Sequence, residues 1–287
     1  MARILAIGIA TLDVVNVVDG YPAENNEVRA VSQRIVRGGN ATNTLVTLSQ
    51  LGHQCAWAGV IADEPDGQRI LKDLAMHEVD ISACHLAHGK APTSYVTLNQ
   101  RNGSRTIVHY RDLPEYDFAS FQQIDLRSCD WLHFEGRNVA QTEQMLHFAA
   151  DNTVAVPRSV EIEKPREGIQ QLFEHADILL FSRSYAVSQG YQDAEKFLKK
   201  MARQARDQEL ICAWGESGAY ALSRDKQMLH SPAYPPAKIV DTLGAGDAFN
   251  AGIINAFLAG QTLEEALESA CRLAGQKCGY MGMDFLK

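Results

Sequence analysis

From residue 130 onward, short apolar runs alternate with longer runs of helical spacing, and this alternation constrains the fold more than any other feature. The apolar runs predict strands at residues 131–134, at 154–156 or 160–162, at 178–181 and at 210–213. Helical spacing predicts helices at residues 142–150, 169–175, 193–207, 247–259 and 263–277. Such alternation is typical of an α/β fold in which a mostly parallel central sheet has helices on both faces.

The region before residue 130 adds shorter strands, several of them polar on one face. The pattern predicts strands at residues 4–9, 12–18, 28–36, 56–61, 93–98 and 106–110, and a helix at 41–51 that ends at Gly52. Asn102-Gly103 is a hairpin signal because both residues tolerate positive φ. We therefore predict a main α/β domain of residues 1–10, 38–91 and 112–287, and a small β-lid of residues 11–37 and 92–111.

Charge and apolar content exclude several classes of protein. Lys and Arg number 27 against 35 Asp and Glu, a net charge of −8, which disfavours nucleic acid as a partner. No apolar run approaches the roughly 18 residues that cross a membrane, and Asp13 ends the first run without a signal-peptide cleavage pattern. The six cysteines form no CxxC pair, which argues against zinc ribbons. We predict a reduced, cytoplasmic protein without membrane or nucleic-acid partners.

The segment DTLGAGDAF, residues 241–249, has two glycines immediately before a predicted helix. A glycine loop that opens a helix exposes free amides beside the positive end of the helix dipole, so it binds anions. The amides of Gly244, Ala245 and Gly246 could hold a transferring phosphoryl group, with Asp247 as the base that accepts a hydroxyl proton. The alternative is that Asp247 only caps the helix. The loop matches neither the Walker A nor the Rossmann pattern.

A second segment, RGGNATN at residues 37–43, places two glycines at another strand-to-helix junction. Asn40 and Asn43 are three residues apart at the helix start, so their amides can project the same way and bind neighbouring hydroxyl groups. Asp13, at the end of the first strand, adds a charged acceptor for hydroxyls. The alternative for this segment is that Asn40 caps the helix.

The strings RGGNATNTLVTLSQLG and DTLGAGDAFNAG together resemble the two signatures of the ribokinase-like (PfkB) carbohydrate kinases, and the resemblance spans essentially the whole chain. WLHFEGRN, VEIEKPREGIQQLF and CAWGESGAYAL are similar to the members that phosphorylate the 1-hydroxyl of ketohexoses such as fructose. The resemblance implies a ribokinase-like fold, ATP with Mg²⁺, a homodimer formed through the β-lid, and K⁺ near the Asp241 loop as a common family feature.

The resemblance also implies roles for individual residues. The sugar would be held by Asp13, Gly39, Asn40, Asn43, Arg105 and Glu135, with Arg105 also near the transferred phosphate. Asp247 would be the base and Gly244, Ala245 and Gly246 the anion hole. The nucleotide would be bordered by Arg183, Trp214, Gly215, Glu216, Gly218, Gly244, Gly246, Ala274 and Cys278, the last two lining the adenine pocket.

Alternatives remain for several of these residues. Arg105 could be a solvated strand residue, Glu135 could pair with Arg137 or Arg166 on the surface, and Trp214 could belong to the core. His109 and His133 are interpreted as structural.

The magnesium ligands stay open, because the position where many family members carry Asn-x-x-Glu begins at Arg183 and ends at Ala186. ATP phosphates and water would hold most of the ion, with Glu163 or Asp241 assisting through water. Two other functions are considered, a kinase of the same family acting on ribose, tagatose or a nucleoside, and a non-catalytic regulator. The intact glycine loop with Asp247 argues against the regulator.

Overall fold

The structure is a computed structural model that describes residues 1–153, 155–205 and 207–286. Its main sheet has nine strands in the order β15-β14-β13-β12-β11-β10-β1-β4-β6. Seven neighbouring strands, from β13 to β6, run parallel, and β14 and β15 are antiparallel additions at one edge. The strands are β1 (Arg3–Ile7), β4 (Gln54–Ala58), β6 (Val79–Asp80), β10 (Trp131–Glu135), β11 (Arg158–Ile162), β12 (Ile178–Ser182), β13 (Glu209–Ala213), β14 (Ala219–Leu222) and β15 (Met228–Ser231).

Helices cover both faces of this sheet because alternate strand residues point to opposite sides. In β1, Ile4 and Ala6 join one hydrophobic cluster, while Leu5 and Ile7 join the other. The first cluster includes residues of α1 (Asn40–Gln50), α2 (Pro65–Met76), α7 (Ala245–Leu258) and α8 (Leu263–Cys278). The second includes residues of α3 (Phe118–Phe121), α4 (Val139–Asn152), α5 (Arg183–Ser188) and α6 (Ala194–Met201). The predicted mostly parallel sheet with helices on both faces is confirmed.

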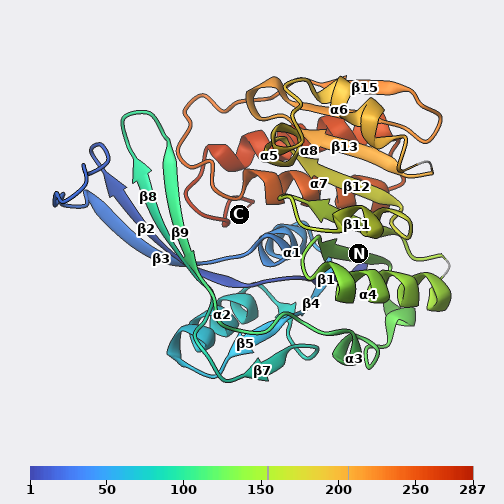
Figure 1. Cartoon of the computed structure of the whole chain (residues 1–287), viewed down its shortest axis with the longest axis horizontal. Helices are drawn as coiled ribbons and strands as arrows, with labels where there is room; N and C mark the ends of the chain where they lie inside the picture. Colours follow the sequence, from blue (N-terminus) through green and yellow to red (C-terminus); the bar gives the residue numbers. More distant parts are fainter. Residues whose placement is uncertain (154, 206, 287) are drawn as a thin grey trace.

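A separate four-stranded sheet, here called the small sheet, projects to one side of the main body (Figure 1). Its order is β3-β2-β8-β9, with β3 (Ser32–Gly38) and β9 (Arg105–Tyr110) at the edges and β2 (Thr11–Val18) parallel to β8 (Thr93–Asn99). These four strands are the ones predicted to pair in the lid. The exact division of the chain into a main domain and a lid stays a prediction.

The structure corrects four local predictions. The single strand predicted at 56–61 is two strands, β4 and β5 (Val60–Ala62), and β5 pairs with β7 (His85–Ala87) in a sheet of its own. Gly59 separates them, where a Cβ would meet the Trp57 ring at 2.2 Å and the chain changes sheets. Helix 193–207 is shorter, since α6 ends at Met201, and 169–175 is a 3₁₀ helix over Ile169–Phe173.

The fourth correction concerns α2, which the sequence did not predict.

A strand was predicted at residues 154–156 or at residues 160–162. Residues 160–162 lie within β11, whereas residues 154–156 include one that lies outside the described residues. None of the helices described is long and apolar enough to span a membrane.

Candidate active site

Asp247 lies in the first turn of α7, where local backbone geometry sets its place. Gly244 adopts φ +82° and is the N-cap, so the helix begins at Ala245 and Asp247 is its third residue. The interpretation of Asp247 as an N-cap is therefore wrong. Its side chain is 7% exposed and its carboxylate points toward α1 rather than toward its own helix end.

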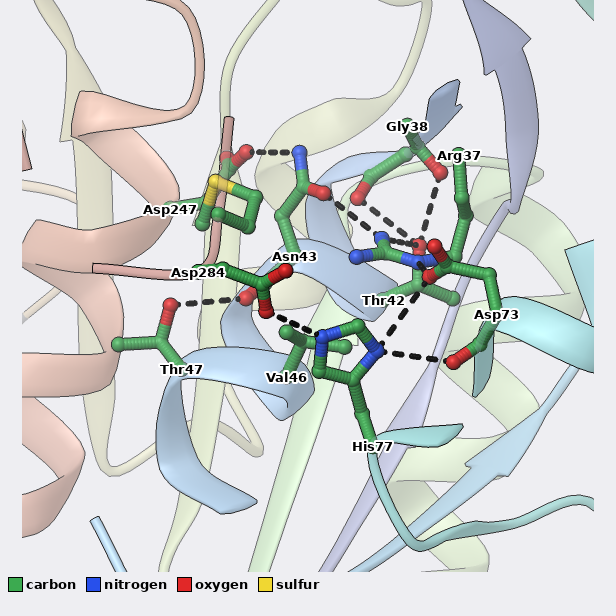
Figure 2. A network of polar contacts seen from close by, with 12 residues as sticks. Arg37, Gly38, Thr42, Asn43, Val46, Thr47, Asp73, His77, Asp247 and Asp284 are labelled. Carbon is green, nitrogen blue, oxygen red and sulfur yellow. Dashed lines mark hydrogen bonds and ion pairs between the residues drawn. The ribbon is translucent and has the colours of Figure 1, made fainter. Parts of the chain in front are cut away.

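The two sequence motifs meet at this carboxylate. The Nδ2 of Asn43 donates a hydrogen bond of 2.7 Å to Oδ2 of Asp247, across 204 residues of sequence (Figure 2). Gly39 is the N-cap of α1 and has no side chain to cap with, so Asn40 is the first helical residue and not the cap. Its Nδ2 instead donates to Oε1 of Glu161 at 3.0 Å. The two asparagines thus bind different carboxylates at the same helix start.

Burial raises the pKa of Asp247 to about 7, because the charged form loses its water. The hydrogen bond from Asn43 and the charge of Arg37 oppose this shift, while Glu163 and Glu135 reinforce it. A carboxylate with a pKa near neutral can both hold and release a proton at physiological pH, which suits a general base.

Glu135 ends strand β10 inside the molecule, so its predicted pairing with Arg137 is found, but in the interior and not on the surface. Its Oε1 accepts the backbone N–H groups of Ala41 at 2.7 Å and Ile9 at 3.2 Å, and Arg137 lies 3.8 Å from its other oxygen. Burial raises the pKa of Glu135 to about 7, against the charge of Arg137. Glu135 therefore fixes the start of α1 against the first strand.

A cavity of about 210 Å³ opens beside Asn43, whereas Asn40 and Glu135 line a separate, smaller pocket. Asp13, Asn43 and Leu243 line one part of the larger cavity, and the C-terminal segment 281–284 closes another. Asp13 accepts a hydrogen bond from the hydroxyl of Thr11 at 2.9 Å, and burial raises its pKa. The cavity presents the predicted sugar-binding Asp13 and Asn43 to the same space.

The glycine loop has open amides at its tip. Ala245 donates its N–H to the carbonyl of Thr242 at 3.3 Å, whereas no hydrogen bond within the described residues uses the amides of Gly244 or Gly246. A Cβ on Gly246 would have no neighbour within 4 Å. Arg105 on β9 reaches this loop, with its Nη1 3.4 Å from the hydroxyl of Thr242.

The predicted nucleotide residues follow the next strands along the same sheet edge. Arg183 begins α5 directly after β12, and its guanidinium lies 5.6 Å from the ring of Trp214, which follows β13. Trp214 is buried in the second hydrophobic cluster, as the core interpretation held, and its backbone N–H donates to the carbonyl of Gly218 at 2.7 Å. Since parallel strands place their carboxyl ends at one edge, these residues share that edge with Glu135 and Glu161.

The remaining predicted nucleotide residues differ in exposure. Glu216 is exposed in the turn between Gly215 and Gly218. Ala274 and Cys278 are half-buried one helical turn apart on α8. The carbonyl of Cys278 accepts the N–H of Val240 at 2.8 Å, which ties this helix to the glycine loop.

Asp241, one of two residues considered for assisting magnesium, is committed to protein partners. Its Oδ2 lies 2.8 Å from Arg34 Nη2 and 3.1 Å from the backbone nitrogen of Gly282, and its Oδ1 accepts the N–H of Leu243. The fully buried Lys277 donates to its carbonyl oxygen at 2.9 Å. Among the described residues no cluster of three or more His, Cys, Asp or Glu side chains could hold a metal ion.

Sequence reasoning missed a polar network behind Asn43 that leads from the interior to the surface. It runs from Arg37 through Asp73 and His77 to Asp284 near the C-terminus (Figure 2). Glu161 was also missed, although it stands at the carboxyl end of a predicted strand, where site residues of parallel sheets gather. Its Oε2 is buried without a hydrogen-bond partner in the described structure, and burial raises its pKa strongly.

The ionisation of His77 predicts a pH-dependent stability. Its hydrogen bonds to Asp73 and, at 2.7 Å, to Asp284 raise its pKa to about 9. A raised pKa contributes stability that is complete below about 6.5 and lost as the pH rises through 9. We expect the free energy of unfolding to fall by about 1–3 kcal/mol over this range. Urea unfolding from pH 6 to 9.5 measures this fall in the free energy of unfolding. His77→Gln should remove the part of the fall that comes from His77. If the free energy of unfolding of that variant falls with pH as steeply as in the wild type, the role assigned to His77 is wrong.

Comparison with known proteins defines the class that the fold and site belong to. The model of the pfkB family of carbohydrate kinases matches residues 1–286, and the chain belongs to this family. Ketohexokinase of Mus musculus is 41% identical over 291 residues, which cover 98% of this chain and 98% of the relative. Fructoselysine 6-kinase of Escherichia coli (strain K12) is 30% identical over 93% of this chain and 96% of the relative.

Solved structures agree on the fold. Ribokinase of Giardia lamblia has a TM-score of 0.85 at 15% identity, over 99% of this chain and 96% of that one. The predicted ATP-dependent carbohydrate kinase with a ribokinase-like fold is thereby confirmed.

Proposed function

We propose that this chain phosphorylates the 1-hydroxyl of a ketohexose such as fructose with ATP, using Asp247 as the general base. One observation carries the mechanism, the 2.7 Å hydrogen bond that joins Asn43 of the first motif to Asp247 of the second. The ketohexose specificity is supported by the 41% identity to mouse ketohexokinase over nearly the full length of both chains.

The reaction follows from the position of the carboxylate. Asn43 occupies Oδ2 of Asp247, so Oδ1 is the oxygen left to accept the hydroxyl proton. As that proton moves, the sugar oxygen bonds to the γ-phosphorus, the bond from phosphorus to the β–γ bridging oxygen breaks, and its electron pair leaves with ADP. Open amides at Gly244 and Gly246, with the nearby guanidinium of Arg105, would hold the charge on the phosphoryl oxygens.

The sugar would lie between Asp13, Asn43 and the start of α1, and the nucleotide along the edge from Arg183 to Cys278. Mg²⁺ bound with ATP would neutralise phosphate charge. With Asp241 committed elsewhere, ATP phosphates and water would hold most of the ion, and Glu163 is the remaining assisting residue. A role for K⁺ and a cytoplasmic location stay predictions.

A panel of acceptors tests the proposal. ATP consumption is measured with fructose, tagatose, ribose, fructoselysine and adenosine; fructoselysine is included because of the 30% identical relative. We expect the highest kcat/KM for fructose or another ketohexose. A clear preference for ribose or adenosine would contradict the ketohexose assignment, and no turnover with any acceptor would favour a non-catalytic regulator.

We also propose that two copies pair through the small sheet. Cross-strand pairing places Ile35, Val14, Tyr95 and Val108 in one row across its face. Three of these side chains are large and exposed: Ile35 by 46%, Tyr95 by 49% and Val108 by 66%. An exposed apolar row on a sheet with two free edges is an unstable surface in water and favours a covering partner.

Light scattering during size-exclusion chromatography checks this pairing. We expect the wild type at twice the 31.6 kDa chain mass. Val108→Asp should reduce it to one chain, because a charge would be buried in the contact. Leu86→Asp, which changes an apolar residue that is 60% exposed on β7, is the matched control and should leave the dimer intact. A monomeric wild type, or a dimeric Val108→Asp, would rule out this surface.

A further inference from the structure

Arg37 carries a buried charge whose position the proposed chemistry leaves unexplained. It lies near the end of β3, and its side chain is 2% exposed. Nε donates to Oδ1 of Asp73 at 2.5 Å, and Nη1 donates to Oδ1 of Asn43 at 2.7 Å and to the hydroxyl of Thr42 at 3.1 Å. Burying a guanidinium is costly unless its donors are satisfied, and here three of its N–H donors have partners on α1 and α2.

The consequence concerns the amide of Asn43, which stands between Arg37 and Asp247 (Figure 2). A guanidinium has donors only, so it can bind the amide only through its oxygen. An ionised carboxylate has acceptors only, so it can bind the amide only through its nitrogen. With both neighbours in place, the Asn43 amide has a single orientation.

We propose that Arg37 is a positioning residue, which locks the Asn43 amide and through it holds Oδ2 of Asp247, leaving Oδ1 aimed at the acceptor hydroxyl. This inference rests on the proposed role of Asp247 as the base. A rotated Asn43 amide would present its oxygen to the carboxylate, and the resulting repulsion would turn the base away from its substrate.

A second effect acts in the same direction. The hydrogen bond from Asn43 and the charge of Arg37 both lower the pKa of Asp247, whereas burial and the charges of Glu163 and Glu135 raise it. The carboxyl group of Glu161 also interacts with that of Asp247. Loss of Arg37 removes its charge and loosens the Asn43 bond, so the pKa of Asp247 should move to higher pH. A purely structural role for Arg37, in joining α1 to α2, predicts no such change.

Three variants and a control separate these possibilities. Arg37→Met removes both the charge and the planar hydrogen-bond donors of the guanidinium. Arg37→Lys keeps the charge but cannot reproduce the planar fork. Asp73→Asn leaves Arg37 in place but weakens its anchor. Arg158→Met is the control, because Arg158 pairs with Asp177 at 3.1 Å at the start of β11 in the main sheet, and its side chain is only 12% exposed.

We expect Arg37→Met to lower kcat about 10–100-fold, the scale of a misplaced reacting group, with the KM for ATP within about twofold. The loss of kcat/KM in this variant should be larger at pH 6 than at pH 8.5, because its acidic limb is shifted to higher pH. Arg37→Lys should lose kcat similarly but keep an acidic limb closer to that of the wild type. Asp73→Asn should show a smaller loss in the same direction, and Arg158→Met should lose stability without changing kcat or the pH profile.

Direct titration of the Asp247 carboxyl group by ¹³C NMR, assigned by difference against Asp247→Asn, needs no substrate. It should show a higher pKa in Arg37→Met, and ADP binding by calorimetry confirms that each variant is folded. An unchanged titration and pH profile in a folded Arg37→Met would overturn the positioning role while leaving the proposed function intact. Absence of sugar turnover in the wild type would reject the proposed function, and the titration would still decide whether Arg37 controls Asp247.

Discussion

Asp247→Asn is expected to lower kcat for sugar phosphorylation by roughly 10²–10⁴-fold, the range for loss of a general base. The substitution keeps the size of the side chain and removes only the oxygen that can accept a proton. The wild-type rate should fall below about pH 7, because burial raises the pKa of Asp247 to about 7 and the base must be ionised. Residual activity of the variant should lack this acidic limb. Initial rates from pH 5.5 to 9 measure both effects.

As the pH rises, the free energy of unfolding should fall while the rate of phosphorylation rises. A carboxyl group whose pKa is raised on folding contributes stability only while it is protonated, and this contribution is lost as the pH rises through about 7. At pH 8 the buried carboxylate therefore destabilises the protein, and the neutral amide should leave the Tm equal to or above that of the wild type. Turnover that survives in Asp247→Asn would reject the base, and a lower Tm at pH 8 would contradict the burial argument.

Gly39→Ala is expected to destabilise the protein by about 3–5 kcal/mol and to abolish sugar phosphorylation. Gly39 has φ +104°, and a Cβ there would lie 2.2 Å from the carbonyl oxygen of Ile9 and 2.9 Å from Cα of Ala10. Both are backbone atoms, so no side-chain rotation relieves the clash. The start of α1 would shift away from the first strand and displace Asn40 and Asn43.

Gly52→Ala is the matched control for backbone strain alone. Gly52 also has a positive φ, +89°, but a Cβ there would meet nothing within 4 Å. We expect a cost of about 1–2 kcal/mol from the left-handed conformation and unchanged kcat. Urea unfolding and steady-state kinetics of both variants provide the comparison. Equal losses of unfolding free energy and of kcat in the two variants would show that the contact with Ile9 has no special role.

Much of the fold followed from local sequence patterns. Apolar runs separated by helical spacing predicted the parallel strands β10, β12 and β13, since such strands are buried on both faces. Asn102-Gly103 and the half-polar runs around it predicted the hairpin of the small sheet. These features depend on residues close together in the chain, which the sequence displays directly.

Other elements could not be predicted in this way. α2 begins with Pro65 and contains Gly67, residues that also mark loops, and Gly67 is required because a Cβ would lie 2.0 Å from the carbonyl of Ala62. The change of sheet at Gly59 likewise depends on packing against Trp57. In both cases a close approach in space, not a local preference, decided the structure.

The sequence by itself determined which groups are present for the proposed catalysis, an acidic residue after a glycine loop and two asparagines after another, because each motif is formed by neighbours in the chain. Only the tertiary structure decided what those groups do. It buried Asp247 and raised its pKa, directed Asn43 to that carboxylate and Asn40 to Glu161, and committed Asp241 to Arg34 and Lys277. The physical reason is that desolvation and charge act through space, and the groups that exert them come from strands and helices far apart in the sequence.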